Sequence, residues 1–406
     1  MKHLLLTPCL IATLFCACDN GNTEPLCPSL ETFGPEVLRP SSADGIRYFD
    51  DLTPGPGNSI VGVGRTSEAR AVLSQLTENG DFIWSTVIPR EDYEVTMLLP
   101  VSTGGYLVVG RNQRFATSPR FVITRTDEVG NIRWTEEYGE NGFENPAGAA
   151  ETPDGKFILF GVTDEPDPDA LSLEKHFRFI RIDDMGTQEL FLEIDLSIQD
   201  NAVAFIRPAT AEEKYWALTT TTSRTNDVIA EDLTLLELTA DGALTSQRRL
   251  AASNLSLWKP GLLSATADGG AILTAPIVEG PQGDSELALL LLKLAPDGTT
   301  QWEQTFPQVD GQPESVIPTA DGGFTVYGRR ASTGQNAPSV LYLLHTNSRG
   351  DIQWCREFTM TDFGLAGDLL QLPDNRYFVN GGQLFRNNST DFLLWTLTLN
   401  ALGIPQ

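Results

Sequence analysis

Histidine is scarce in this chain of 406 residues, which contains only three. His3 lies in a leading apolar segment, so His176 and His345 are the two that remain for a folded domain. Ser-His-Asp and Cys-His sites need a positioned base, and the G-x-S-x-G, G-x-x-x-x-G-K and H-E-x-x-H motifs are absent. The sequence therefore predicts no catalytic residue and favours a protein that is not an enzyme.

Basic residues are also few. The chain has 28 Lys and Arg against 54 Asp and Glu, which gives a formal net charge of -26. An acidic surface repels nucleic acid and anionic lipid headgroups, so we expect no nucleic-acid partner. After residue 17 no apolar run is long enough for a transmembrane helix.

Only five cysteines occur, and three of them fall within the first 18 residues. Residues 1–17 combine Lys2 and His3, an apolar run and a small-residue ending, which is typical of a signal peptide. The ending resembles the lipobox of bacterial lipoproteins, which would make Cys18 the lipidated residue and residues 18–28 a flexible tether. The resemblance implies a lipid-anchored protein of the cell envelope, periplasmic or surface-exposed; plain secretion is the alternative.

A repeat extends along nearly all of the remaining chain. Its first half is a turn glycine that recurs about every 50 to 56 residues, at Gly80, Gly130, Gly186, Gly242, Gly298, Gly350 and Gly403. Four of these glycines are followed four positions later by tryptophan, at Trp84, Trp134, Trp302 and Trp354. These four are more than half of the seven tryptophans in the chain. We expect their indoles to pack one repeat against the next, because large rings bury the most apolar area.

A second half-motif, typified by Asp321-Gly322-Gly323-Phe324, recurs in the same seven units. Each half-motif is a polar turn between two short apolar runs, which indicates a β-hairpin. Two hairpins make a four-stranded sheet that cannot bury its faces alone. The sequence therefore predicts an all-β fold, a seven-bladed β-propeller of four-stranded antiparallel blades.

The predicted propeller covers residues 29–406. Its repeats lie at about 46–88, 94–138, 147–195, 201–251, 259–306, 313–358 and 366–402. The last repeat ends before its fourth strand, and residues 29–34 are similar to a fourth strand from inside the chain. We expect this N-terminal strand to close the ring, which removes exposed strand edges at the seam.

The repeat, written D-x-x-G-x-x-x-W and D-G-G-Y-x-x-x-G, resembles those of bacterial secreted and lipoprotein β-propellers. It is also distantly similar to the Trp-bearing repeats of quinoprotein-type propellers. The chain departs from these in having seven units rather than eight, and Leu190 and Ser246 in place of tryptophan. The resemblance implies the fold and no active-site residue.

One candidate ligand site lies on the loops that enter each blade and at the ends of the second strands. It combines aromatic and basic residues: Tyr93, Phe143, Trp258, Phe363, Arg65, Arg111, Arg329 and Arg330. Such groups could bind a sugar, a peptide or an anion. Alternatively, the aromatic side chains fill blade junctions and the arginines pair with the acidic surface. Long connections within blades, at about 164–169, 221–232 and 278–286, are expected to be exposed loops.

The first functional hypothesis is a non-enzymatic, monomeric binding or scaffold propeller whose ligand is an envelope protein, peptide or glycan. A carbohydrate-active or quinone-dependent enzyme that uses carboxylates near the propeller axis is a second, and a structural or adhesive protein a third. No cofactor is expected. Calcium, bound by Asp164, Asp167 and Asp169, is the alternative, although these residues match no calcium loop of known spacing and an acidic solvated loop is the preferred explanation.

Cys27 and Cys355 are the two thiols left after processing and lipidation, and in an exported chain they are expected to form a disulfide. The bond would tie the closing strand to the sixth blade. Intact mass of the alkylated native protein, with and without reductant, tests the pairing. Two alkylated cysteines in the unreduced protein would contradict it.

Overall fold

A computed structural model gives the fold of residues 45–112, 119–140, 143–166, 173–194, 200–206, 213–225, 228–252, 262–279, 286–307, 309, 311–330, 340–359, 364–384 and 392–406. These residues form seven antiparallel sheets, and the only helix among them is the 3-10 turn η1 (Pro56–Asn58). No helix in this part of the chain is long and apolar enough to cross a membrane.

The strands follow one another in chain order, and each group of four forms one blade. Blades 1 and 2 comprise β1 (Ile46–Pro54), β2 (Ile60–Thr66), β3 (Ala71–Leu76), β4 (Phe82–Val87), and β5 (Tyr93–Pro100), β6 (Tyr106–Asn112), β7 (Phe121–Thr126), β8 (Ile132–Tyr138). Blades 3 and 4 comprise β9 (Phe143–Glu151), β10 (Phe157–Pro166), β11 (Leu173–Ile182), β12 (Gln188–Ile194), and β13 (Asp200–Ile206), β14 (Lys214–Thr225), β15 (Val228–Thr239), β16 (Leu244–Ala252).

The same order continues in the second half of the chain. Blades 5 and 6 comprise β17 (Leu262–Ala265), β18 (Ala271–Glu279), β19 (Glu286–Leu294), β20 (Thr300–Phe306), and β21 (Gly311–Pro318), β22 (Phe324–Arg330), β23 (Val340–Thr346), β24 (Ile352–Thr359). Blade 7 comprises β25 (Gly364–Gln371), β26 (Tyr377–Leu384) and β27 (Phe392–Leu399).

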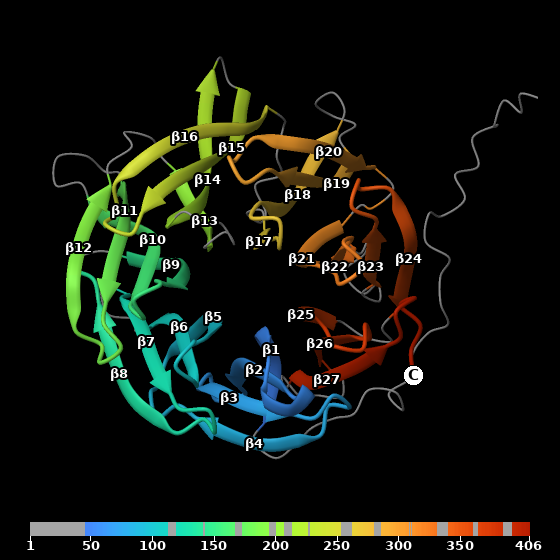
Figure 1. Ribbon diagram of the computed structural model, residues 1–406, viewed down its shortest axis with the longest axis horizontal. Helices are drawn as coiled ribbons and strands as arrows, with labels where there is room; N and C mark the ends of the chain where they lie inside the picture. The colour runs from blue at the N-terminus through green and yellow to red at the C-terminus, as the bar shows by residue number, and fades with distance from the viewer. Residues whose placement is uncertain are drawn as a thin grey trace, which may run out of the picture.

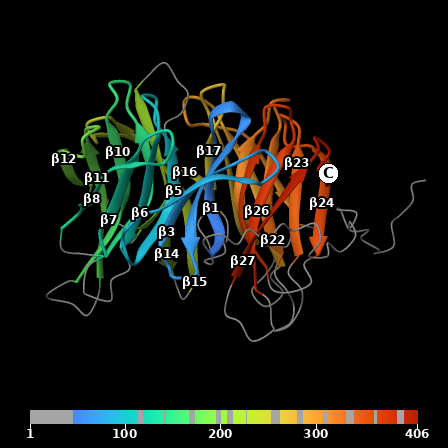
Figure 2. The same ribbon diagram turned by 90° about the horizontal axis from the view of Figure 1, so that it is seen from below.

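The seven sheets stand around one axis, with the first strand of each blade nearest the axis and the fourth on the circumference (Figure 1). In the perpendicular view the strands run between the two faces of a disc (Figure 2). The predicted seven-bladed β-propeller is therefore confirmed. Blade 7 has three strands among the described residues. The closing strand predicted at 29–34 lies outside them and stays a prediction.

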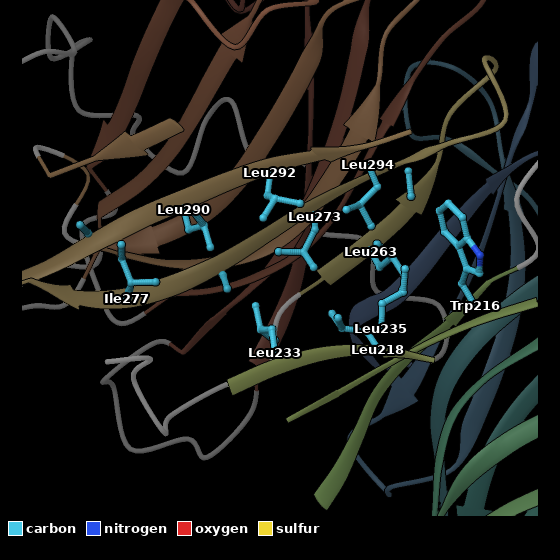
Figure 3. Close-up of a cluster of buried hydrophobic side chains, with 13 residues drawn as sticks. Trp216, Leu218, Leu233, Leu235, Leu263, Leu273, Ile277, Leu290, Leu292 and Leu294 are labelled. Atoms are coloured by element: carbon cyan, nitrogen blue, oxygen red, sulfur yellow. The ribbon is translucent and has the colours of Figure 1, made fainter. Parts of the chain in front are cut away.

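The hydrophobic core is divided among the junctions between blades. Between blades 4 and 5, Trp216 and Leu235 pack against Leu273 and Leu292 from the facing sheet (Figure 3). Similar clusters fill the other junctions. Each blade carries apolar side chains on both faces of its sheet, so it depends on its two neighbouring blades to bury them.

The repeated tryptophans lie at these junctions, above the turn of the following blade. A Cβ atom at Gly130 would lie 2.4 Å from the indole of Trp84, and one at Gly403 would lie 2.6 Å from that of Trp354. Trp134 and Trp302 approach Gly186 and Gly350 in the same way. The turn glycines therefore have two reasons to be glycine: a positive φ, 79° at Gly130, and the indole of the preceding blade.

A second set of glycines, in the second strands, adjoins a bulge in the innermost strand. At Gly64 and Gly110 a Cβ atom would lie 2.1 Å from the carbonyl oxygens of Tyr48 and Glu94. The pairing register shifts beside these positions, between Phe49 and Asp51 in β1 and between Val95 and Met97 in β5. Because a bulge re-aims the side chain that follows it, this glycine determines where residues such as Asp51 point.

Substituting alanine for Gly130 tests the contact between blades. We expect Gly130→Ala to destabilise the protein by about 2–4 kcal/mol, from the positive φ and the clash with Trp84. Gly155→Ala is the matched control, because its φ of 78° is equally unfavourable while a Cβ there meets nothing within 4 Å. Urea denaturation would measure both. Equal losses of stability in the two variants would contradict the contact. So would an extra loss in Gly130→Ala that stays the same when Trp84 is also replaced by alanine.

Candidate functional site

The two faces of the disc differ in regularity. One face, the turn face, carries the hairpin turns between the first and second and between the third and fourth strands. In all seven blades the third-to-fourth turn closes with the same N–H···O bond of 2.8–3.0 Å, from Thr77 to Asp81 in blade 1. The opposite face, the loop face, carries the connections between second and third strands and those between blades.

Blades differ from one another mainly on the loop face. The second and third strands have 12 residues each in blade 4 and 10 each in blade 3, but 7 and 6 in blades 1 and 2. Residues 221–232 are therefore largely strand, which corrects the expectation of an exposed loop. β14 has five threonines among its 12 residues, and threonine favours strands because it is β-branched.

The end of the β14–β15 hairpin is a two-stranded ribbon. β13 pairs with β14 as far as Thr221, and β16 pairs with β15 as far as Asp232. Beyond these residues β14 and β15 continue to pair only with each other, up to Thr225 and Val228. Within the described part of the chain neither edge of this ribbon has a neighbouring strand, which is the arrangement that strand addition uses. Residues 195–199 and 253–261, which adjoin β13 and β16 in the sequence, lie outside the described residues.

A line of paired charges borders the loop face of blades 1 to 3. Glu94 Oε2 lies 2.8 Å from Arg111 Nε, and Glu94 Oε1 lies 3.7 Å from Arg65 Nη1. Arg111 also donates a hydrogen bond to Asn145, and Arg65 donates one to the Tyr48 hydroxyl at 3.2 Å. Both arginines are thus held by neighbouring acidic or polar groups, while 25% of the Arg65 side chain and 32% of the Arg111 side chain remain exposed.

Tyr93 is fully buried, so its ring is not available to a ligand on the loop face. Its hydroxyl donates to the carbonyl oxygens of Val108 and Val122, each at 2.9 Å. Burial also raises the pKa of this phenol. Tyr93 therefore fills the junction between blades 1 and 2, which is the alternative that the sequence left open for these aromatic residues.

The other predicted site residues are only partly placed. Arg329 donates to Gln312 at 3.3 Å and Arg330 to Glu357 at 2.9 Å, both on blade 6. Trp258, Phe363, Cys18 and Cys27 lie outside the described residues, as does the Phe143 side chain. Cys355 is buried in the core of blades 5 and 6 and is half of a disulfide bond; its predicted pairing with Cys27 stays a prediction.

Two carboxyl groups that the sequence analysis did not single out meet on the innermost strands. Asp51 of β1 and Asp368 of β25 are both half-buried and are neighbours, because the Leu52 N–H donates to Asp51 Oδ1 and to Asp368 Oδ2, each at 2.9 Å. Burial, followed by the neighbouring charge of Asp368, raises the pKa of Asp51 well above its usual range. Burial likewise raises the pKa of Asp368. Both shifts favour retention of a proton by this pair above the usual pKa of aspartate.

Each of these carboxyls also accepts backbone hydrogen bonds from the next blade. The Leu98 N–H donates to Asp51 Oδ2 at 2.6 Å, and the Leu52 N–H donates to Asp368 Oδ2 at 2.9 Å. In blade 2 the equivalent residue is Met97, whose sulfur lies 3.2 Å from the Ala149 N–H. When the repeats are aligned on their turns, Asp51 and Asp368 occupy the same position. Such an alignment does not show that the bulge directs the side chain at this position toward the next blade.

His345 is built into blade 6. Its Nδ1 lies 2.9 Å from the Thr325 hydroxyl and its Nε2 lies 3.0 Å from Asp321 Oδ2. The hydroxyl is buried and the carboxylate is exposed, the reverse of a hydrolase triad, in which the nucleophile must reach substrate. The equivalent residue of blade 5, Lys293, binds Asp268 at 2.9 Å, so this position anchors a turn.

Metal binding finds no support in the described part of the chain, where no group of three His, Cys, Asp or Glu side chains converges. Asp164 lies in β10, 4.0 Å from Lys175. Asp167 and Asp169, the other predicted calcium ligands, are outside the described residues.

The sequence matches no protein-family model and no curated protein. Its fold is similar to that of puromycin hydrolase, with a TM-score of 0.52 and 14% identity over 93% of this chain and 56% of that one. A protein of unknown function from Dyadobacter fermentans has a TM-score of 0.49 and 11% identity, covering 76% of this chain and 95% of its own. Semaphorin 1b from Drosophila has a TM-score of 0.43 and 10% identity, covering 87% of each chain. These similarities are of fold alone.

Removing the Tyr93 hydroxyl tests whether this residue is structural. We expect Tyr93→Phe to lower the free energy of unfolding by about 1 kcal/mol, because two buried carbonyls lose a donor. Tyr106→Phe is the control, since the Tyr106 hydroxyl has no hydrogen-bond partner among the described residues and we expect a smaller change. Thermal denaturation would measure both, and an unchanged Tyr93→Phe protein would contradict the structural role.

Proposed function

We propose that this chain is a non-enzymatic binding or scaffold propeller of the bacterial envelope, anchored through lipid on Cys18, whose loop face receives a polypeptide partner. The observation that carries the proposal is that the described blades differ from one another mainly on that face. In repeat proteins, insertions on one face usually mark the binding surface.

The β14–β15 ribbon favours a polypeptide over other ligands. Its two edges present backbone N–H and C=O groups beyond Thr221 and Asp232. An extended peptide can bind such an edge by strand addition, with main-chain hydrogen bonds supplying affinity. The partly exposed charges of Arg65, Glu94 and Arg111 lie on the same face and offer both signs to a partner. A glycan is the alternative class of ligand.

Location in the envelope rests on the sequence alone. The signal-like residues 1–17, the lipobox resemblance at Cys18 and the polar tether support attachment to a membrane. Secretion without an anchor is the alternative. Mass spectrometry of the mature N-terminus distinguishes the two, because a lipoprotein begins with a diacylglyceryl-modified Cys18.

The carboxyl pair of Asp51 and Asp368 is the observation that would favour an enzyme. Each carboxyl, however, already accepts a backbone hydrogen bond from the next blade, and both accept from the Leu52 N–H. A general acid or base has to reach the substrate proton. We therefore do not assign this pair a catalytic role.

Shortening the ribbon tests the proposed function. Replacing residues 222–231 with Asn-Gly gives a two-residue hairpin turn between Thr221 and Asp232, and we expect this variant to lose capture of envelope peptides that the wild-type protein retains. The assay uses immobilised mature protein with an extract of envelope proteins and, separately, a glycan array. Arg349→Ala, at an exposed tip on the turn face, is the control and should behave as wild type.

Each outcome has a defined meaning. Capture lost only in the shortened variant, at an unchanged melting temperature, would support the loop face as the binding surface. Capture that is indifferent to the deletion would contradict the ribbon's role. Binding on the glycan array alone would replace the polypeptide by a glycan.

A further inference from the structure

The carboxyl pair lies at the junction where the propeller ring closes. Asp51 belongs to the first blade and Asp368 to the last, so their contact joins the two ends of the repeat array. Two further hydrogen bonds cross the same junction: Leu52 N–H to Asp368 Oδ2 at 2.9 Å, and Phe49 N–H to Asn380 Oδ1 at 3.0 Å. The innermost part of the seam is therefore held by polar contacts.

These contacts extend to the neighbouring blade. The Leu98 N–H of blade 2 donates to Asp51 at 2.6 Å. One hydrogen-bonded series thus runs from blade 7 through blade 1 to blade 2. Its central link is the contact between two carboxyl groups.

That central link requires a proton. Two ionised carboxylates have acceptors only and repel each other, whereas a carboxyl and a carboxylate share one strong hydrogen bond. The groups that act most strongly on the two side chains are each other, the Ser315 hydroxyl and the N–H groups of Leu52, Leu98 and Leu369; none is a cation.

Other elements packed against the pair contribute few charges. Asp50 precedes Asp51 on β1, Glu314 precedes Ser315 on β21, and the buried Tyr327 hydroxyl of β22 lies near Asp368. Asn380 of β26 presents a neutral amide, and β5 presents the Leu98 N–H. Two arginines face these neighbours: Arg65 of β2 lies 3.8 Å from Asp50, and Arg329 of β22 acts on the Tyr327 hydroxyl. They offset part of the negative charge around the pair.

We propose that Asp51 and Asp368 form a proton-bridged clasp that holds the first and last blades together, and that loss of the bridging proton at higher pH loosens this junction. The clasp is independent of the proposed binding function. It would make closure of the ring, and with it the shape of the loop face, sensitive to pH.

The direction of the pH effect follows from the raised pKa values of both carboxyls. Between the ordinary pKa of aspartate, about 3.8 in the unfolded chain, and the raised pKa of the pair, the folded protein holds more protons than the unfolded one. The stability that the clasp contributes therefore decreases as pH rises through this window. For turn aspartates such as Asp127, the contribution to stability changes with pH in the opposite direction. Hydrogen bonds from Asn131 outweigh the effect of burial and lower the pKa of Asp127.

Proton release on unfolding measures the clasp. In the upper part of this pH window the wild-type mature protein should release about one more proton per molecule on unfolding than Asp51→Asn, because the asparagine amide donates to Asp368 without a titrating proton. Calorimetry in buffers of different ionisation enthalpy gives this number. Asp127→Asn is the matched control and should release as many protons as wild type.

Two further measurements keep the test decisive if Asp51→Asn fails to fold. The folded wild-type protein should show the infrared C=O stretch of a protonated carboxyl at the same pH, and Asp368→Asn should lack it. On raising the pH, the Leu52 and Leu98 amides should exchange hydrogen faster than base catalysis alone predicts, while the Leu273 amide of blade 5 should not. No such infrared band, or equal proton release in wild type and Asp51→Asn, would overturn the proposal.

Discussion

The contact between the indole of one blade and the turn glycine of the next is the interaction on which the rest of the structure depends. A four-stranded sheet with two apolar faces is stable only between neighbours. Trp84 above Gly130 and Trp354 above Gly403 set how closely adjacent blades approach. Where tryptophan is missing, as at Leu190, other apolar groups such as Leu192 and Phe179 take the place above Gly242.

This stacking constrains the two faces differently. The turn face carries the glycines that receive the indoles, and the turn after the third strand, to which these glycines belong, closes with the same hydrogen bond in every blade. The loop face takes no part in that contact, and the second and third strands that are connected there range from 6 to 12 residues in length. The freedom to vary explains why we place the binding function there. Near this face, Arg65 and Arg111 are held by Glu94 and other side chains of the blades.

Closing the ring raises a separate physical problem, because the first and last blades are joined by no short connection. Asp51, Asp368 and Asn380 supply polar contacts across that junction. Their position results from the bulge in the innermost strand, which the second-strand glycine permits. A strongly acidic chain thus uses two acidic groups, bridged by a proton, where blades of the same array have Met97 or Ser315.

The sequence by itself determined the seven blades, their order and the turn positions, because turn chemistry and repeat spacing are local and recur seven times. It could not place the candidate site. Tyr93 is buried only because the neighbouring blade covers it, which the sequence does not show. Residues 221–232 form most of a hairpin because β14 and β15 pair with each other there. Only the tertiary structure brought Asp51 and Asp368 together, since their contact joins positions more than 300 residues apart and their retained proton arises from burial and mutual repulsion.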